Sequence, residues 1–126
     1  MNHKVHNAYL EGRILSSDPL TLVCILYDSA LENVRAARES LQAGDVRSRS
    51  NSISKVSEVL GVLIESLNLD EGMELSRNLL RLYLYMQGRL LEANLQQSDR
   101  CLAEVEGLLA TLSQSWNQLA KNAAAS

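Results

Sequence analysis

Four stretches of this chain repeat apolar residues at steps of three and four positions, and short polar breaks separate them. This spacing places the apolar side chains on one face of an α-helix. In the last stretch, over roughly residues 99–120, the pattern runs without interruption through Leu102, Val105, Leu109, Leu112, Trp116 and Leu119. Long helices joined by short turns predict an all-α fold, an antiparallel up-down-up-down four-helix bundle.

The polar breaks set the expected bounds of the helices. We expect helices over roughly residues 19–42, 46–67, 73–97 and 99–120, and a tail over 121–126 that frays. Pro19 suits the first position of a helix, after Ser17 or Asp18 as N-cap, and Gly44 suits the left-handed position that ends one. The polar run 46–54 is expected to extend past the core. The 126 residues suit a single domain, with a mobile arm over 1–16 and the bundle over 17–126.

Apolar residues also occur off the expected core faces. On the first helix the core row starts at Val23, whereas Leu22 and Ile25 point elsewhere, and Val59 and Val62 lie off the row of the second helix. On the third helix we expect these residues to point inward: Leu75, Leu79, Leu82, Met86, Leu90 and Ala93. A second row on that helix is formed by Leu80, Leu84, Leu91 and Leu95, with Tyr83 between the rows. Helices with two apolar faces need a partner to cover the second face.

Charge and hydropathy exclude several classes of function. The net charge of −3 argues against a nucleic-acid partner. No apolar run approaches the roughly 20 residues of a membrane-spanning helix, so no membrane insertion is expected. The first residues lack the apolar core of a signal peptide, which predicts a cytoplasmic protein. In that reducing compartment Cys24 and Cys101 are interpreted as buried, unpaired thiols.

The sequence lacks the side chains from which bundles build reactive sites. Both histidines, His3 and His6, lie in the arm, so the Glu-x-x-His pairs of di-iron bundles and a histidine on a bundle helix are absent. We interpret Glu92 and Arg89 as members of a salt bridge that holds helices in register rather than as an acid/base pair. We therefore expect no enzyme activity, no metal and no cofactor.

Three segments carry motifs in a fixed order. The first joins Ala8-Tyr9 to ILSSDP at 14–19 and LYD at 26–28, and the second joins SLN at 66–68 to Gly72, NL at 78–79, LY at 82–83 and YM at 85–86. The third is RLLEANL at 89–95, followed by the late Trp116. Together they resemble the flagellar secretion chaperone family, FliS, over about residues 8–118. Ser29 stands where that family usually has glycine, and Ser16-Ser17-Asp18 replaces its commoner TAS.

The resemblance implies a cytoplasmic chaperone for flagellin. Such a chaperone binds the disordered C-terminal segment of flagellin, prevents premature polymerisation and delivers the subunit to the flagellar export apparatus, a type III secretion system. The residues expected to bind flagellin are Leu22, Ile25, Tyr27, Val59, Val62, Leu80, Tyr83, Leu84, Leu91 and Asn94. Tyr27 could equally be a core residue. Gly88, opposite the core row of the third helix, could let a client helix approach closely.

The arm has two interpretations. In one, Tyr9, Leu10, Ile14 and Leu15 cover the binding groove of the free protein and the client displaces them. In the other, the arm is a permanent part of the fold.

Further partners compatible with the resemblance are export-gate components or a co-chaperone, and the chain itself would be a monomer or a weak homodimer. The alternative function is a self-associating structural or adaptor bundle that has no disordered client.

Overall fold

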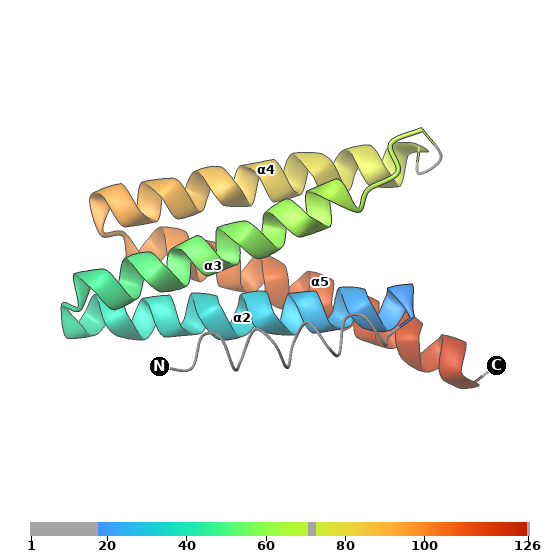
Figure 1. Ribbon diagram of the computed structural model, residues 1–126, viewed down its shortest axis with the longest axis horizontal. Coiled ribbons are helices and arrows are strands. Elements are labelled where there is room, and N and C mark those ends of the chain that lie inside the picture. The colour runs from blue at the N-terminus through green and yellow to red at the C-terminus, as the bar shows by residue number, and fades with distance from the viewer. Residues whose placement is uncertain (1–17, 71–72, 126) are drawn as a thin grey trace.

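The computed structural model describes residues 18–70 and 73–125, which form an antiparallel up-down-up-down four-helix bundle (Figure 1). Its helices are α2 (Pro19–Ala43), α3 (Val46–Glu65), α4 (Met73–Gln96) and α5 (Asp99–Ala125). Both α2 and α4 pack against α3 and α5, so that α2 and α4 lie diagonally across the core. The structure confirms the all-α fold, whereas the arm lies outside the described residues.

Local signals in the sequence determine where the first helices begin and end. Asp18 caps α2, because its Oδ1 accepts a hydrogen bond from the backbone N–H of Thr21 at 2.8 Å, and Pro19 occupies the first turn. The helix ends at Gly44, whose φ of 74° is the left-handed conformation that glycine adopts without steric cost. Asp45 then caps α3 by accepting from the N–H of Ser48. Gly44 and the cap at Asp45 explain the short turn between α2 and α3.

The core is a single apolar cluster to which all four helices contribute. Tyr27 of α2 and Tyr83 of α4 are its largest fully buried side chains, and their hydroxyl oxygens lie 2.7 Å apart across the diagonal. Cys24 and Cys101 are buried and unpaired, as expected.

Three local predictions are wrong at the ends of the bundle. Leu75 and Leu119, expected inward, are 65% and 51% exposed because the start of α4 and the last turns of α5 lie where neighbouring helices no longer cover them. The tail expected to fray continues α5 to Ala125. Arg49, in the run expected to extend past the core, is buried.

Arg49 is buried because α4 supplies its hydrogen-bond partner. Its Nε donates to Oδ1 of Asn94 at 3.1 Å, and a second guanidinium nitrogen donates to the Asn94 carbonyl oxygen at 3.3 Å. The hydroxyl of Ser50 donates to the same Oδ1. Asn94 therefore links α4 to the first turns of α3.

Candidate functional site

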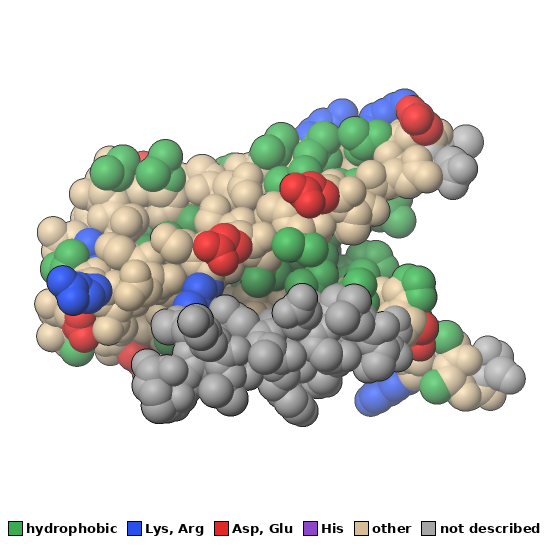
Figure 2. Space-filling view, viewed as in Figure 1, with side chains coloured by type: hydrophobic (Ala, Val, Ile, Leu, Met, Phe, Trp, Pro, Cys, Tyr) green, Lys and Arg blue, Asp and Glu red, His purple; other side chains and the backbone are tan. Residues whose placement is uncertain are grey.

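The outward side of α4 carries exposed leucines. Leu84, Leu91 and Leu95 are 52%, 62% and 74% exposed, and Gly88 lies among them on the same side of the helix. We call these four residues the α4 outer stripe. They line a shallow groove together with Tyr85, Arg89, Glu92 and Gln96. In Figure 2, hydrophobic side chains gather along the upper edge of the molecule, over α4.

The charged groups beside this groove are paired with one another. Arg89 forms an ion pair with Glu92 on its own helix, and its Nε lies 2.6 Å from Oε1 of Glu104 on α5. Tyr85 donates its hydroxyl proton to Glu104, and this hydrogen bond, with the one from Arg89, lowers the pKa of the Glu104 carboxyl. The predicted salt bridge at Arg89 thus exists, and Glu104 is the residue through which it joins two helices. One arginine and two carboxylates therefore lie beside the apolar floor of the groove.

A second apolar site is a cleft of about 210 Å³ at the end of the bundle where α4 begins. In Figure 1 the start of α4 diverges there from the end of α5, and Figure 2 shows a notch at the same place. All four helices line the cleft, through residues that include Val23, Leu63, Leu67, Leu75, Leu79, Tyr83 and Trp116. A cleft of this size and composition suits one or two large apolar side chains.

The polar atoms near this cleft are uncharged. Burial raises the pKa of both Tyr27 and Tyr83, which keeps the two hydroxyls protonated at neutral pH. The indole N–H of Trp116 is buried and lacks a hydrogen-bond partner of good geometry among the described residues, although it lies near enough to the Tyr27 hydroxyl to favour the phenolate slightly. These groups can orient a ligand but supply no nucleophile.

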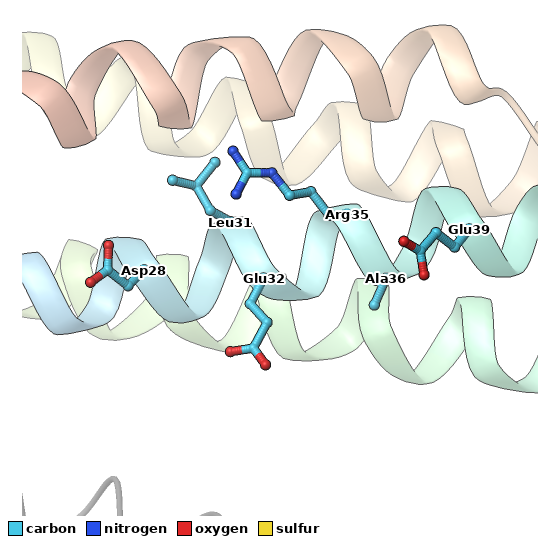
Figure 3. Close-up of a pocket in the computed structure, with 6 residues that line it drawn as sticks. All are labelled: Asp28, Leu31, Glu32, Arg35, Ala36 and Glu39. Atoms are coloured by element: carbon cyan, nitrogen blue, oxygen red, sulfur yellow. The ribbon is translucent and has the colours of Figure 1, made fainter.

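The outer face of α2 is polar. Figure 3 shows Asp28, Glu32 and Glu39 along this face, where Arg35 lies beside Leu31. The Arg35 Nε lies 3.0 Å from Oε2 of Glu106 on α5, so the arginine pairs across the helix interface. No group of three His, Cys, Asp or Glu residues that could hold a metal ion occurs within 18–70 and 73–125. Over the same ranges no helix is long and apolar enough to cross a membrane.

The ten residues expected to bind flagellin occupy different environments. Val62, Leu84 and Leu91 are exposed, and Leu22, Val59 and Leu80 are partly exposed. Ile25, Tyr27 and Tyr83 are buried, which places Tyr27 in the core, and a client could reach these three only if the helices moved. Asn94 is half-buried and bonded to Arg49. The predicted arm residues Tyr9, Leu10, Ile14 and Leu15 lie outside the described residues. Client contact by these residues stays a prediction.

The structure brings together a site that the periodicity did not predict. Leu67, Leu75 and Trp116 meet in the cleft although Leu67 lies in the connection after α3, Leu75 on α4 and Trp116 on α5. Their spacing gave no signal, because a core row and a cleft wall follow the same three-and-four pattern. The cleft forms because α4 diverges from α5, and the sequence pattern of one helix does not predict how two helices diverge.

Comparison with known proteins gives one consistent family. A family model described as "Flagellar protein FliS" matches residues 1–123. The "Flagellar secretion chaperone FliS" of Salmonella typhimurium is 35% identical over 115 residues, which cover 90% of this chain and 85% of that protein. The "Flagellar secretion chaperone FliSB" of Pseudomonas aeruginosa is 32% identical over 108 residues, or 86% of each chain. The FliS protein of Bacillus subtilis is 27% identical over 113 residues, which cover 90% of this chain and 84% of that protein.

Proposed function

Because this chain belongs to the FliS family of flagellar proteins, whose relatives are named as secretion chaperones, we propose that it is a chaperone for flagellin. It binds the disordered C-terminal segment of flagellin in the cytoplasm. Binding prevents premature polymerisation and keeps the subunit ready for delivery to the flagellar export apparatus. The protein carries out no catalysis of its own.

The observation that supports this function most is the exposure of the α4 outer stripe. Burying a leucine side chain stabilises a complex by roughly 1.5–3 kcal/mol, and three leucines of the stripe are more than half exposed. A disordered segment that folds on binding loses about 2–5 kcal/mol in ordering. Burial of Leu84, Leu91 and Leu95 can therefore offset the ordering of one client helix.

Further contacts would have to come from other surfaces. Val62 of α3 is 48% exposed, and Leu22 of α2 and Val59 of α3 are partly exposed. A client that contacts these residues as well as α4 must wrap around the bundle. A disordered segment can do so, because it adapts its path to separate surfaces.

Isothermal titration calorimetry with the C-terminal segment of flagellin from the same organism tests the function. We expect one-to-one binding with a large negative heat-capacity change, because apolar surface becomes buried. A peptide of the same composition in scrambled order is the control and should not bind. Absence of binding in the micromolar range would contradict the proposal.

The alternative, a self-associating bundle without a client, uses the same exposed leucines. Light scattering of the free protein separates the two functions. A stable dimer that is indifferent to the flagellin segment would favour self-association, whereas a monomer that forms a one-to-one complex would favour the chaperone.

A further inference from the structure

The α4 outer stripe continues toward the start of the helix with two basic residues. Arg77, Arg81, Leu84, Gly88, Leu91 and Leu95 follow one another at alternating steps of four and three. At 100° per residue these six positions fall within about 80° of arc on the side away from the core. All six are exposed. This is the spacing of a coiled-coil seam, on a helix that has no neighbour on this side among the described residues.

Gly88 leaves a gap in the middle of the seam. A Cβ atom at this position would have no heavy-atom neighbour within 4 Å, so folding does not require a glycine here. Glycine is nevertheless among the poorest residues for the interior of a helix. Gly61 and Gly107 are equally uncrowded, but Gly88 alone among these three lies between leucines at both adjacent seam positions, Leu84 and Leu91. A gap framed by leucines accepts a large side chain from a second helix.

The basic end of the seam also lacks a counterpart. Within 18–70 and 73–125 neither Arg77 nor Arg81 forms an ion pair with a carboxylate, and Arg81 instead donates to the neutral side chain of Asn78 at 2.7 Å. Figure 2 shows basic side chains near the start of α4, next to hydrophobic ones and to an acidic side chain. A helix that carries carboxylates at one end of its apolar row would complement both parts of the seam.

A second copy of this chain does not complement the seam. In an antiparallel pair centred on Gly88, Arg81 of one copy would face Leu95 of the other. In a parallel pair Arg81 would face Arg81. Neither arrangement places a carboxylate at the seam position that faces Arg81, which favours a different chain as the occupant.

We infer that the seam from Arg77 to Leu95 docks one amphipathic helix of the flagellin segment, with a large apolar side chain over Gly88 and an acidic end at Arg77 and Arg81. The inference rests on the proposed function and adds the place, the direction and the register of one client helix. The seam is a surface for positioning the client and involves no chemical step.

Filling the gap at Gly88 tests the register. In Gly88→Leu we expect the affinity for the flagellin segment to fall about tenfold or more, because the added side chain occupies the space of the client residue. The urea midpoint should not fall, since the site is uncrowded and leucine favours the helix. Gly107→Leu is the matched control on α5, at an exposed and equally uncrowded site, and should keep wild-type affinity.

Reversing the charge at the basic end tests the direction. The double variant Arg77→Glu with Arg81→Glu should lower the affinity by about threefold or more and abolish the weakening of binding by salt. The control is Arg47→Glu with Arg100→Glu, which changes the net charge equally at exposed arginines outside the seam. In this control variant, salt should weaken the binding of the flagellin segment as it does in the wild-type protein.

The outcomes separate this inference from the function on which it rests. If wild-type protein binds the segment and Gly88→Leu binds it equally well, the seam is not the docking site although the chaperone function holds. If the seam variants change only the oligomeric state of the free protein, the seam is a contact between copies and the inference is wrong. If the wild-type protein does not bind the segment, both proposals fail.

Discussion

The hydroxyl groups of Tyr27 and Tyr83 meet inside the apolar core and form a hydrogen bond with each other across the diagonal of the bundle. A buried hydroxyl that loses its partner keeps its desolvation cost, whereas removing both hydroxyls removes the cost as well. The pair therefore fixes how α2 and α4 sit relative to one another more than it adds to total stability.

Single and double replacements of this pair should show that asymmetry. We expect Tyr27→Phe to lower the free energy of unfolding by about 1–2 kcal/mol, because the Tyr83 hydroxyl stays buried without a partner. The double variant Tyr27→Phe with Tyr83→Phe should be no less stable than either single variant. Urea denaturation of the four proteins measures the coupling. Additive losses would mean that the two hydroxyls act independently.

Asn94 stands in the motif that resembles the FliS family, and its contacts in the structure are internal. We expect Asn94→Ala to lower the free energy of unfolding by about 2–3 kcal/mol, because the buried Arg49 guanidinium loses its hydrogen bond to the Asn94 side chain. Thermal unfolding measures the loss. Asn78→Ala, at an exposed site of the same helix, is the control and should change stability little. If the Asn94 variant keeps full stability and loses client affinity, Asn94 is a binding residue instead.

At the residue scale, periodicity predicted most of the core, although it wrongly placed Ile25 off the core face, and it did not predict the roles of polar groups. It placed Leu79, Met86 and Leu90 inward correctly. It did not predict the burial of Arg49, because that depends on an asparagine 45 positions away in sequence. It left Tyr27 undecided, since a tyrosine on the core row can point its hydroxyl either into the protein or to its surface.

At the scale of elements, α2 and α5 are joined by ion pairs along one side. Arg38 lies 2.9 Å from Oδ1 of Asp99 and 2.8 Å from Oε1 of Glu106, and its hydrogen bonds lower the pKa of both carboxyl groups below their ordinary values of 3.8 and 4.5. Because these pKa values are lower in the folded protein, the pairs stabilise it fully above the ordinary values. That contribution is lost as the pH falls through the folded-state values.

Replacing Arg38 should therefore lower the free energy of unfolding at neutral pH but not in acid. We expect Arg38→Met to lower the free energy of unfolding by about 1 kcal/mol at pH 7, a modest effect because the pairs are partly exposed. The difference from wild type should shrink as the pH falls below about 4. Urea denaturation across this range measures it, with Arg47→Met as the control for an exposed arginine. A difference that does not depend on pH would show that Arg38 stabilises through packing.

The order, direction and approximate bounds of the helices could all be predicted from the sequence. Caps such as Asp18 and Gly44 act within a few residues, so the helix ends that they form can be predicted from the nearby sequence. The end of α5 was predicted too early, because the polar composition of 121–125 says little about a helix that is already nucleated by a long packed segment. The divergence of α4 from α5, which creates the cleft, depends on how whole helices pack.

At the scale of the molecule, the arm stays a prediction that solution experiments can decide. Deleting residues 2–12 should tighten the binding of the flagellin segment or promote aggregation, if apolar arm residues cover the groove in the free protein. A variant with serine at Tyr9, Leu10, Ile14 and Leu15 should act in the same direction while keeping the chain length. Calorimetry and light scattering measure the two effects. Unchanged affinity and solubility in both variants would count against a covering arm.

The two ends of the bundle are not equivalent. The short connections at 44–45 and 97–98 lie at one end, and the segment 66–70 after α3 lies at the other, beside the cleft, the start of α2 and the end of α5 (Figure 1). Backbone amides near the cleft should exchange with solvent through small local openings, whereas those beside the two short turns should need a larger unfolding event. We therefore expect the cleft to widen and admit a bulky side chain while the helix pairs α2–α3 and α4–α5 stay intact.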